Sequence, residues 1–536
     1  MLLRKLKRKL RKMPKTSIVI TILVFIVLLC MTSGYALLSQ KLDIFGTSKI
    51  VIPDYRIYIS NVAVKSSTDG GYATNTATFT DNEVALYTTL PNLNSSVTYE
   101  ITIKNIGNSN AITDYMYTAS NNASVKYKIK EINSTEVVSK LSERKVLVTV
   151  EPIENATAAV GDSTVAINFA FLQENSSYSN SCTMNWDGSS SQQPVSTTIL
   201  GSTYYLISNA NEFKWFMDQV NGGNTTINAI LTDDICLNNM GISPIASSNA
   251  YAGIFDGQNR TISGISFTRD EEVSSGNKTS YMGLFYNNSG IIKNVNFIGS
   301  YSDVHMAKTR ENTSYIAGVV INNSGIIENV SFGGTINLNA TAHVNCTMRQ
   351  AHTWNYVGGI ASTNTGIIRG SNNKATFTLV GKTTQATCNI YSRSSNIYAG
   401  GIASTNSGFI VDSYNSANIT MTGSNEEKTR TENIAKIGGI VSTNNNQTKN
   451  TYTSGTITQS MDGDGTWDYV TDAIATNSGS YSNTYYLSGS IPTLPSTPIG
   501  TLATATDLIN LNVSIGNAFK VDNKSINNGY PILFWQ

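Results

Sequence analysis

The chain has 536 residues, which is too long for one ordinary hydrophobic core and suggests roughly two to four domains. Charged residues make up only 14% of it, and 37 basic residues balance 36 acidic ones, so its overall charge argues against a nucleic-acid partner. Asn, Ser, Thr, Gly and Tyr are abundant, and β-branched and aromatic residues recur throughout, which favours stacked β-sheets over helical bundles or disorder.

The N-terminus is typical of an export segment. Eight basic residues precede the run Ile18 to Met31, which is uncharged and almost wholly apolar. Counted as residues 16–38, the segment is long enough for a membrane span of about 20 residues, and Gly34-Tyr35-Ala36 fits a signal-peptidase site. We expect a basic cytoplasmic tail at 1–15, then a transmembrane anchor or, alternatively, a signal cleaved near Ala36. The protein is then either held at the cell membrane with extracellular domains or secreted.

Residues 50–190 show the period-two pattern of strands with one buried face. Apolar and polar residues alternate from Val97 to Ile103, and again at 146–150 and 165–171, which predicts a β-sandwich. SVTYEITIKNIGNSNAI resembles immunoglobulin-like surface domains, and with GYALLSQKLDIFGTSKI it is similar to camelysin-type exported proteins of Gram-positive bacteria. Camelysin-type metal or protease residues do not carry over, because this region has no histidine. The Ser/Gln/Gly-rich stretch at 191–203 is expected to be a linker.

An internal repeat dominates residues 204–500. Six segments, among them GGIASTNTGII and GGIASTNSGFI, align without gaps at intervals of 33 to 42 residues. Each has a short apolar strand, an Asn-Ser/Thr-Gly turn, a second strand and a variable loop. Two columns of turn residues recur: the asparagines Asn288, Asn323, Asn364, Asn406, Asn444 and Asn477, and the turn positions Gly290, Gly325, Gly366, Gly408, Asn446 and Gly479.

Stacking of these units would pair each strand with its equivalents above and below. The asparagines would then form a hydrogen-bonded ladder, with Ile and Val columns filling the interior. The turn glycines are expected at positive φ, where Asn446 is the best-tolerated substitute. Independent hairpins, the alternative, could not bury their apolar faces.

The repeat resembles the GLUG repeat of bacterial surface proteins. FDGQNRTISGISF is similar to the opening coil of pectin-lyase-like right-handed β-helices, and the ending NNGYPILFWQ looks like the terminus of many GLUG-containing proteins. The resemblance implies a parallel β-helix on a cell surface, with adhesion the usual suggestion.

Solenoid ends need caps, because the first and last coils expose unpaired edges. A short helix near 209–221 is expected at the first coil, since the apolar residues between Phe213 and Val220 have the spacing of one helix face. Residues 501–536 are expected to close the last coil. The predicted fold is all-β: one membrane or signal helix, a β-sandwich, and then a right-handed parallel β-helix (solenoid).

No catalytic, cofactor-binding or metal site is expected. Glu328 and Asp412 fall at different positions after the turn, so they do not share the column that paired carboxylates would need. Two patterns are weak signals of a metal-binding site: the group His343, Cys346 and His352, and the stretch Asp462 to Gly465. Most other acidic residues, including Asp270, Glu271, Glu272, Glu426 and Glu427, are assigned to the variable loops.

The variable loops carry Tyr, Trp, Arg and His and form a candidate binding face, or else serve as spacers; they lie at 301–316, 338–356, 378–398 and 421–436. We expect a non-catalytic exported surface protein for adhesion or structural display. Its expected partners are the membrane, through 16–38, and a host or matrix glycan or protein. The alternative is a carbohydrate-active β-helix enzyme, either a polysaccharide lyase or a glycosidase.

The cysteines show no zinc-type spacing. Cys346 and Cys388 each lie 20 residues before the turn glycine of their repeats, so they occupy equivalent positions of consecutive coils. Stacked strands lie about 4.8 Å apart, which a disulfide can bridge. We expect this bond outside the membrane, with two free thiols as the alternative. The pattern leaves the state of Cys182 and Cys236 open.

Overall fold

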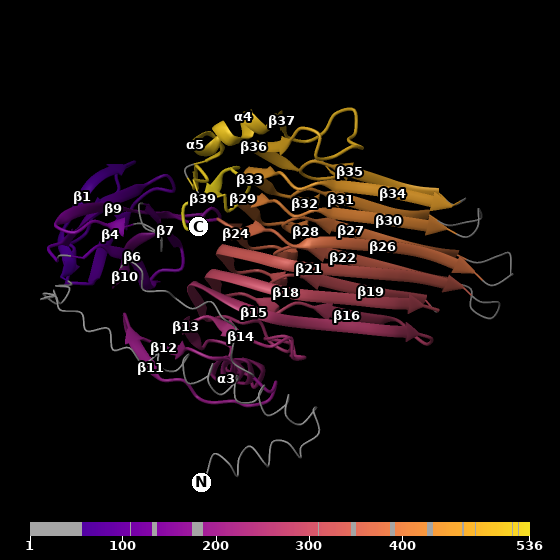
Figure 1. Ribbon diagram of the computed structural model, residues 1–536, viewed down its shortest axis with the longest axis horizontal. Helices are drawn as coiled ribbons and strands as arrows, with labels where there is room; N and C mark the ends of the chain where they lie inside the picture. The colour runs from indigo at the N-terminus through magenta and orange to yellow at the C-terminus, as the bar shows by residue number, and fades with distance from the viewer. Residues whose placement is uncertain are drawn as a thin grey trace, which may run out of the picture. The chain divides into compact units, whose positions relative to one another are not determined.

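The computed structural model describes residues 56–536 except 108, 131–136, 174–185, 309, 345–349, 386–391, 426–431, 464–465, 478, 517 and 524. The chain is mostly β, with 62% of residues in strands and 5% in helices (Figure 1). The expected membrane segment at 16–38 lies outside the described residues. Within the part that is described, no helix is long and apolar enough to cross a membrane.

Two antiparallel sheets begin the described chain. The first has the order β1 (Ile57–Thr68), β5 (Ser96–Asn105), β9 (Ser142–Pro152) and β7 (Val125–Lys130). The second has the order β2 (Tyr72–Ala73), β4 (Glu83–Leu90), β10 (Gly161–Gln173), β6 (Ala111–Ser120) and β8 (Val137–Val138), with β3 (Thr78–Phe79) paired to β4. The alternating pattern of β5 buries Val97, Tyr99 and Ile101 beside Leu86 and Ile167 of the other sheet, so both sheets share one core.

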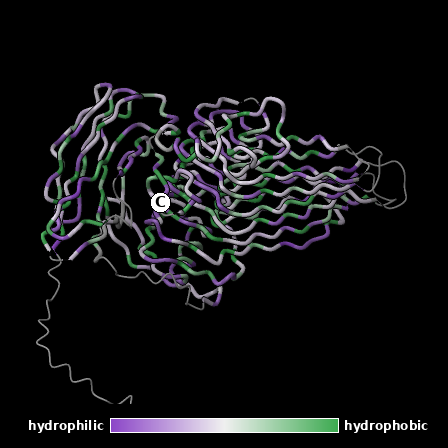
Figure 2. The backbone as a smooth tube through the Cα atoms, turned by 45° about the horizontal axis from the view of Figure 1, so that its top comes forward, coloured by the Kyte–Doolittle hydropathy of each residue, from purple (hydrophilic) through white to green (hydrophobic). Residues whose placement is uncertain are grey.

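The repeats form a β-solenoid of about five turns, which confirms the prediction of a solenoid. Apart from the antiparallel β11–β12 pair, neighbouring solenoid strands pair in parallel. Figure 2 shows hydrophobic and hydrophilic residues alternating along the strands. The hydrophobic residues that face inward form one continuous core from the first coil to the last.

Each full coil contributes to three sheets. We call the 16-stranded one the long sheet; it contains β11 (Ser196–Ile199), β12 (Ser202–Ile207), β13 (Asn228–Leu231), β14 (Ile235–Cys236), β15 (Ile254–Val273), β18 (Ile291–Ala307), β21 (Ile326–Val344), β24 (Ile367–Arg369), β25 (Asn372–Asn373), β26 (Thr376–Gln385), β29 (Phe409–Asn415), β30 (Ile419–Asn425), β33 (Gln447–Thr453), β34 (Ile457–Gly463), β36 (Ser480–Leu487) and β37 (Thr501–Ala503). The second sheet has β16 (Lys278–Met282), β19 (Arg310–Ala317), β22 (Gln350–Gly358), β27 (Ser392–Gly400), β31 (Glu432–Gly438) and β35 (Thr466–Asp472). The short sheet has β17 (Phe285–Asn288), β20 (Val320–Asn323), β23 (Ala361–Asn364), β28 (Ala403–Asn406) and β32 (Val441–Asn444).

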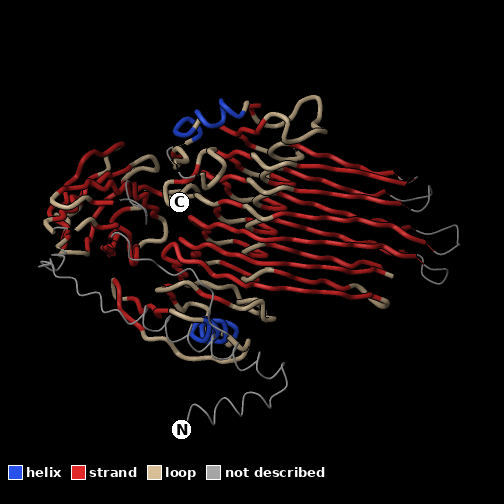
Figure 3. The backbone as a smooth tube through the Cα atoms, in the orientation of Figure 1, coloured by secondary structure: helices blue, strands red, loops and turns tan. Residues whose placement is uncertain are grey.

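The segments expected to be variable loops are mostly strands, which corrects that interpretation. In four coils a strand of the long sheet is followed directly by a strand of the second sheet, and these consecutive strands stack from coil to coil (Figure 3). They are β18 and β19, β21 and β22, β26 and β27, and β30 and β31. Asp270, Glu271 and Glu272 accordingly lie in β15. The inserts keep a period-two alternation, with Ile336 and Leu338 facing the core, and each neighbouring coil supplies a strand to pair with.

The repeated asparagines form a buried ladder where the short sheet turns into the long sheet. Nδ2 donates to Oδ1 of the next coil at 2.8 Å for Asn288–Asn323 and Asn323–Asn364, and at 2.7 Å for Asn364–Asn406 and Asn406–Asn444. These side chains are at most 2% exposed. At Asn477 the pattern changes, because its Oδ1 accepts from the backbone N–H of Asn444 at 2.6 Å. The ladder satisfies amides that would be costly to bury unpaired.

The turn glycines are needed for close packing, and the expectation of positive φ is wrong. None of the turn positions, from Gly290 to Gly479, lies in the left-handed region. A Cβ on Gly366 would instead lie 2.1 Å from the carbonyl oxygen of Gly325 in the previous coil. Asn446 does carry a Cβ, and there the hydrogen bond from Gln447 N to Gly408 O is 3.4 Å, against 2.9 Å for the equivalent bond one coil earlier.

A different column is left-handed, four residues after the turn. Its members share φ values between 49° and 56°: Asn294, Asn329, Gly370, Asp412, Asn450 and Asn483. Asn, Asp and Gly are the residues that best tolerate this conformation. Asn329 donates to Asn294 at 3.0 Å, and Asn450 donates to Asp412 at 2.8 Å, so this column forms a second, interrupted ladder.

Short helices lie at opposite ends of the stack of coils (Figure 3). α3 (Ala210–Asn221) begins at Asn209, whose side chain accepts from Glu212 N at 3.1 Å, and its Phe216 packs on Phe255 at 5.4 Å. At the other end lie α4 (Ala505–Asn510), α5 (Asn512–Ile515), β38 (Phe519–Lys520) and β39 (Ile532–Leu533). Phe519 there packs on Tyr452.

The turn packing gives a first testable prediction. Gly366→Ala should destabilise the solenoid by about 1–3 kcal/mol, because its methyl group has no room against the Gly325 carbonyl. Thermal melting and urea unfolding measure the effect. Asn446→Ala, at the same turn position of a later coil, is the matched control and should change stability by less than about 0.5 kcal/mol. Equal effects of the two substitutions would contradict the account of the glycine column.

Candidate functional site

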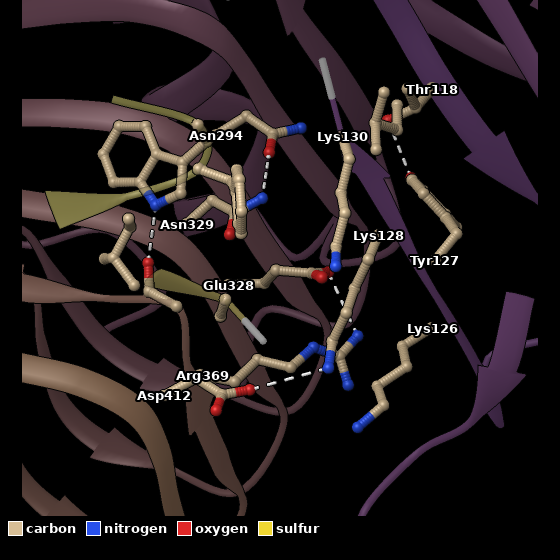
Figure 4. Close-up of a pocket in the computed structure, with 16 residues that line it drawn as sticks. Thr118, Lys126, Tyr127, Lys128, Lys130, Asn294, Glu328, Asn329, Arg369 and Asp412 are labelled. Atoms are coloured by element: carbon tan, nitrogen blue, oxygen red, sulfur yellow. Dashed lines mark hydrogen bonds and ion pairs between the residues drawn. The ribbon is translucent and has the colours of Figure 1, made fainter. Parts of the chain in front are cut away.

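A cavity of about 70 Å³ lies where the N-terminal sheets, the long sheet and the C-terminal segment meet (Figure 4). Its size suits a few water molecules better than a drug-sized ligand. The lining side chains are mostly polar or charged: Thr118, Lys126, Tyr127, Lys128 and Lys130 from β6 and β7, Asn294, Glu328, Asn329, Arg369 and Asp412 from the long sheet, and Phe534 and Trp535 near the C-terminus.

The long sheet contributes a column of charges with alternating sign. Strand register places Asp256 beside Lys293, Lys293 beside Glu328, and Glu328 beside Arg369. Lys293 Nζ lies 3.1 Å from Asp256 Oδ2, and Arg369 lies 3.1 Å from Glu328 Oε2. All four residues are at most 9% exposed. We call this set the charged column; Lys293, Glu328 and Arg369 hold the third position after the turn in three consecutive repeats, and Asp256 is the register partner of Lys293 in the coil before them.

The two cations of the charged column reach into the N-terminal sheets. Lys293 Nζ donates to the carbonyl and hydroxyl oxygens of Thr118, at 2.5 and 2.9 Å, and to the Tyr127 hydroxyl at 2.6 Å. Arg369 also donates to Glu154 Oε2 at 3.1 Å. Charged groups buried with this many hydrogen-bond partners fix the geometry of an interface.

The lysines of β7 complete the network. Lys126 pairs with Glu154 and, at 3.4 Å, with Glu151. Lys128 pairs with Glu151 at 3.2 Å and with Asp412 at 3.7 Å, the latter drawn in Figure 4. Lys130 lies over the Phe534 ring at 5.2 Å, a cation–π contact with the C-terminal segment.

The charges of the cluster balance. Five cations, Lys126, Lys128, Lys130, Lys293 and Arg369, face five anions, Glu151, Glu154, Asp256, Glu328 and Asp412. Such an arrangement holds two surfaces together and leaves no surplus charge to recruit a small ion. The cluster is therefore best described as a packed contact between the N-terminal sheets and the solenoid.

The pKa values of Glu154 and Lys293 keep both groups ionised at neutral pH. Burial opposes the charge on Glu154, but Arg369 and Lys126 outweigh it and lower the Glu154 pKa to about 2. Burial likewise opposes the charge on Lys293, yet Asp256 and Tyr127 raise its pKa above the ordinary value. The charges on Glu154 and Lys293 are thus stabilised by their partners in the folded protein.

Of the residues singled out from the sequence, Glu328 and Asp412 both line the cavity although they belong to different columns. His343 and His352 instead bond hydroxyl groups, of Thr384 at 2.8 Å and of Ser394 at 2.7 Å. The described residues contain no group of three or more His, Cys, Asp or Glu side chains arranged to hold a metal ion.

The cysteines are only partly described. Cys346 and Cys388 lie outside the described residues, so the disulfide between them stays a prediction. Cys236, which the sequence left open, is disulfide-bonded. The other four cysteines all lie outside the described residues.

Sequence reasoning missed the charged column and its contacts with the N-terminal sheets. A signal was present: Lys293, Glu328 and Arg369 each lie three residues after a turn glycine, in a chain where charged residues are scarce. The alternate lysines of VKYKIK were a second signal, because alternate strand residues share a face. No protein-family model matches the chain, and no curated protein matches it either.

The second prediction concerns acid stability. Glu154 has a pKa of about 2 in the folded chain and an ordinary value near 4.5 when unfolded. Its contribution is therefore complete above pH 4.5 and is lost as the pH falls toward 2. Glu154→Gln should reduce the loss of stability over this range, as measured by urea midpoints at several pH values. Glu143→Gln, in an exposed pair with Lys104, is the control and should leave the slope unchanged; equal slopes for all three proteins would refute the role of Glu154.

Proposed function

We propose that the chain is a non-catalytic exported surface protein that binds or displays through its β-solenoid. One observation carries the proposal: the strands of the long sheet and of the second sheet stack in register from coil to coil, so their described ends away from the turn, such as Ala307 and Ala342, lie at one end of the two sheets (Figure 1). The charged column lies near the opposite end of these strands. Because the N-terminal sheets contact the solenoid at the charged column, we propose that a partner binds at these strand ends.

We also propose that the solenoid is a right-handed β-helix of the GLUG-repeat type, preceded by a camelysin-like, immunoglobulin-like β-sandwich. The recurring Asn-Ser/Thr-Gly turns and their buried asparagine ladder support the first part. Two antiparallel sheets around one core support the second. Adhesion, with a host or matrix glycan or protein as partner, is the role that this resemblance implies.

The proposed location is the cell surface of a Gram-positive bacterium. Residues 16–38 would anchor the protein in the membrane with 1–15 in the cytoplasm, or cleavage near Ala36 would release it. The basic segment before an apolar run supports export. The disulfide bond of Cys236 adds support, because such bonds persist mainly outside the reducing cytosol.

Several carboxylates of the solenoid have structural partners, which supports binding over catalysis. Glu328 is held by Arg369, and Asp303 accepts hydrogen bonds from Ser314 and lies 2.9 Å from His305 Nδ1 inside the solenoid. Asp303 is fully buried. A glycosidase or lyase would instead need acidic groups that a sugar chain can reach.

The third prediction tests this proposal. Protease treatment of intact cells should release peptides from residues 54–536 and none from 1–15. The purified full chain should bind a subset of a glycan array or a host matrix protein, and should release no reducing sugar from the polysaccharides that it binds. A solenoid that proteases reach only after lysis would contradict surface exposure. Steady sugar release would establish the enzyme alternative.

A further inference from the structure

Four tyrosines stack in a column on the outer face of the second sheet. Tyr281, Tyr315, Tyr356 and Tyr398 are register partners on β16, β19, β22 and β27. Their ring centroids are 5.4, 5.0 and 5.2 Å apart, and neighbouring rings are within 13° of parallel. Strand alternation turns residues such as Val357 into the core and leaves the tyrosines partly exposed, with Tyr281 36% exposed.

A second uncharged column runs beside the tyrosines. Its members occupy the same four strands two residues earlier: Thr279, Thr313, Trp354 and Asn396. Trp354 lies nearly parallel to Tyr398 at 6.5 Å, and Tyr286 of β17 meets Tyr281 edge-on at 4.5 Å. We call the eight residues of the two columns, together with Tyr286, the tyrosine strip.

The tyrosine strip is electrically neutral. Burial raises the pKa of Tyr356 to about 12 and also raises that of Tyr315 and Tyr398, so the phenols keep their protons at physiological pH. The charged residues nearest to the strip in the register are at its borders: Glu311 on one side, Lys436 in the next coil and Asp468 in the coil after that. The strip therefore offers ring edges and hydroxyl groups and no ion pair, while the amide of Asn396 is buried at 1% exposure.

We infer that the tyrosine strip binds a neutral, extended polysaccharide chain that lies along the solenoid axis. Because the stacked rings cover one another's faces, the column presents ring edges and phenol hydroxyls, and these hydroxyls and those of the threonines exchange hydrogen bonds with sugar hydroxyls. Electrostatic complementarity points to an uncharged chain, because the strip carries no charge. The inference deepens the proposed surface-binding function and rests on it.

The period of the strip supports this orientation. Equivalent groups repeat once per coil, about 4.8 Å apart, which is close to the length of one sugar ring in an extended chain. One sugar unit would then meet one tyrosine, with Thr279, Thr313 or Trp354 beside it in three of the four strands. Affinity should rise with chain length until the four coils are filled.

Calorimetry on the purified full chain tests the inference with three neutral hexasaccharides: cellohexaose and chitohexaose, which are extended, and maltohexaose, which coils. We expect binding to at least one extended probe and weaker binding to maltohexaose. Tyr356→Ala should weaken binding to that probe at least about tenfold, as truncation of an aromatic anchor does. Tyr72→Ala, which removes a tyrosine 54% exposed on β2, should leave the affinity within about twofold of the original.

Tyr356→Phe keeps the stack and removes one hydroxyl group, so it separates binding from folding. It should melt like the original protein and bind with intermediate affinity. Three results would each overturn the inference. They are binding to neither extended probe, equal affinity of the Tyr356 and Tyr72 variants, and preference for a charged polysaccharide such as polygalacturonate. Protease shaving of cells reports surface display separately. If the protein is displayed on the cell surface but binds none of these sugars, the inference about the tyrosine strip is wrong and the proposed surface function is not affected.

Discussion

The contact between the turn backbones of successive coils is the constraint on which the rest of the solenoid depends. At Gly366 the chain passes so close to the previous coil that even a methyl group would collide with the Gly325 carbonyl. The asparagine ladder runs next to this contact and is buried, so a slipped coil would leave amides without partners. Turn contact and ladder together fix the register of every strand that leaves the turn.

The register places equivalent residues of successive repeats next to one another, so that each column of the sequence repeat forms a surface of the solenoid. The third residue after the turn becomes the charged column, in which Lys293 and Arg369 reach the N-terminal sheets. Further along each coil, a single tyrosine per repeat becomes the stacked column of the second sheet. Both sites arise because one position per repeat is copied along the axis, which is how solenoids build extended surfaces from short motifs. The two surfaces lie on different sheets, so docking and binding need not compete.

The sequence predicted the solenoid and its asparagine columns because a repeated motif that aligns without gaps admits few other arrangements. It did not reveal why Gly366 is glycine, because the motif shows that glycine recurs at this position but not whether φ or a neighbouring carbonyl favours it. The inserts were read as loops because their lengths differ between repeats. The alternation of apolar and polar residues around Ile336 and Leu338 already favoured strands. Hydrogen-bonded pairing with the next coil stabilises them as strands. The contact through Arg369 and Glu154 joins residues 215 positions apart, and no local pattern encodes such a pair.

Removal of one rung of the buried ladder tests the account most directly. Asn364→Ala would leave both the Asn323 amide and the Asn406 oxygen without their partners. The account predicts that urea unfolding of the full chain shows a loss of at least about 2 kcal/mol. Asn445→Ala, at an exposed turn position of a later coil, should cost less than about 0.5 kcal/mol. If Asn364→Ala were as stable as Asn445→Ala, the asparagine ladder would not be what holds successive coils in register.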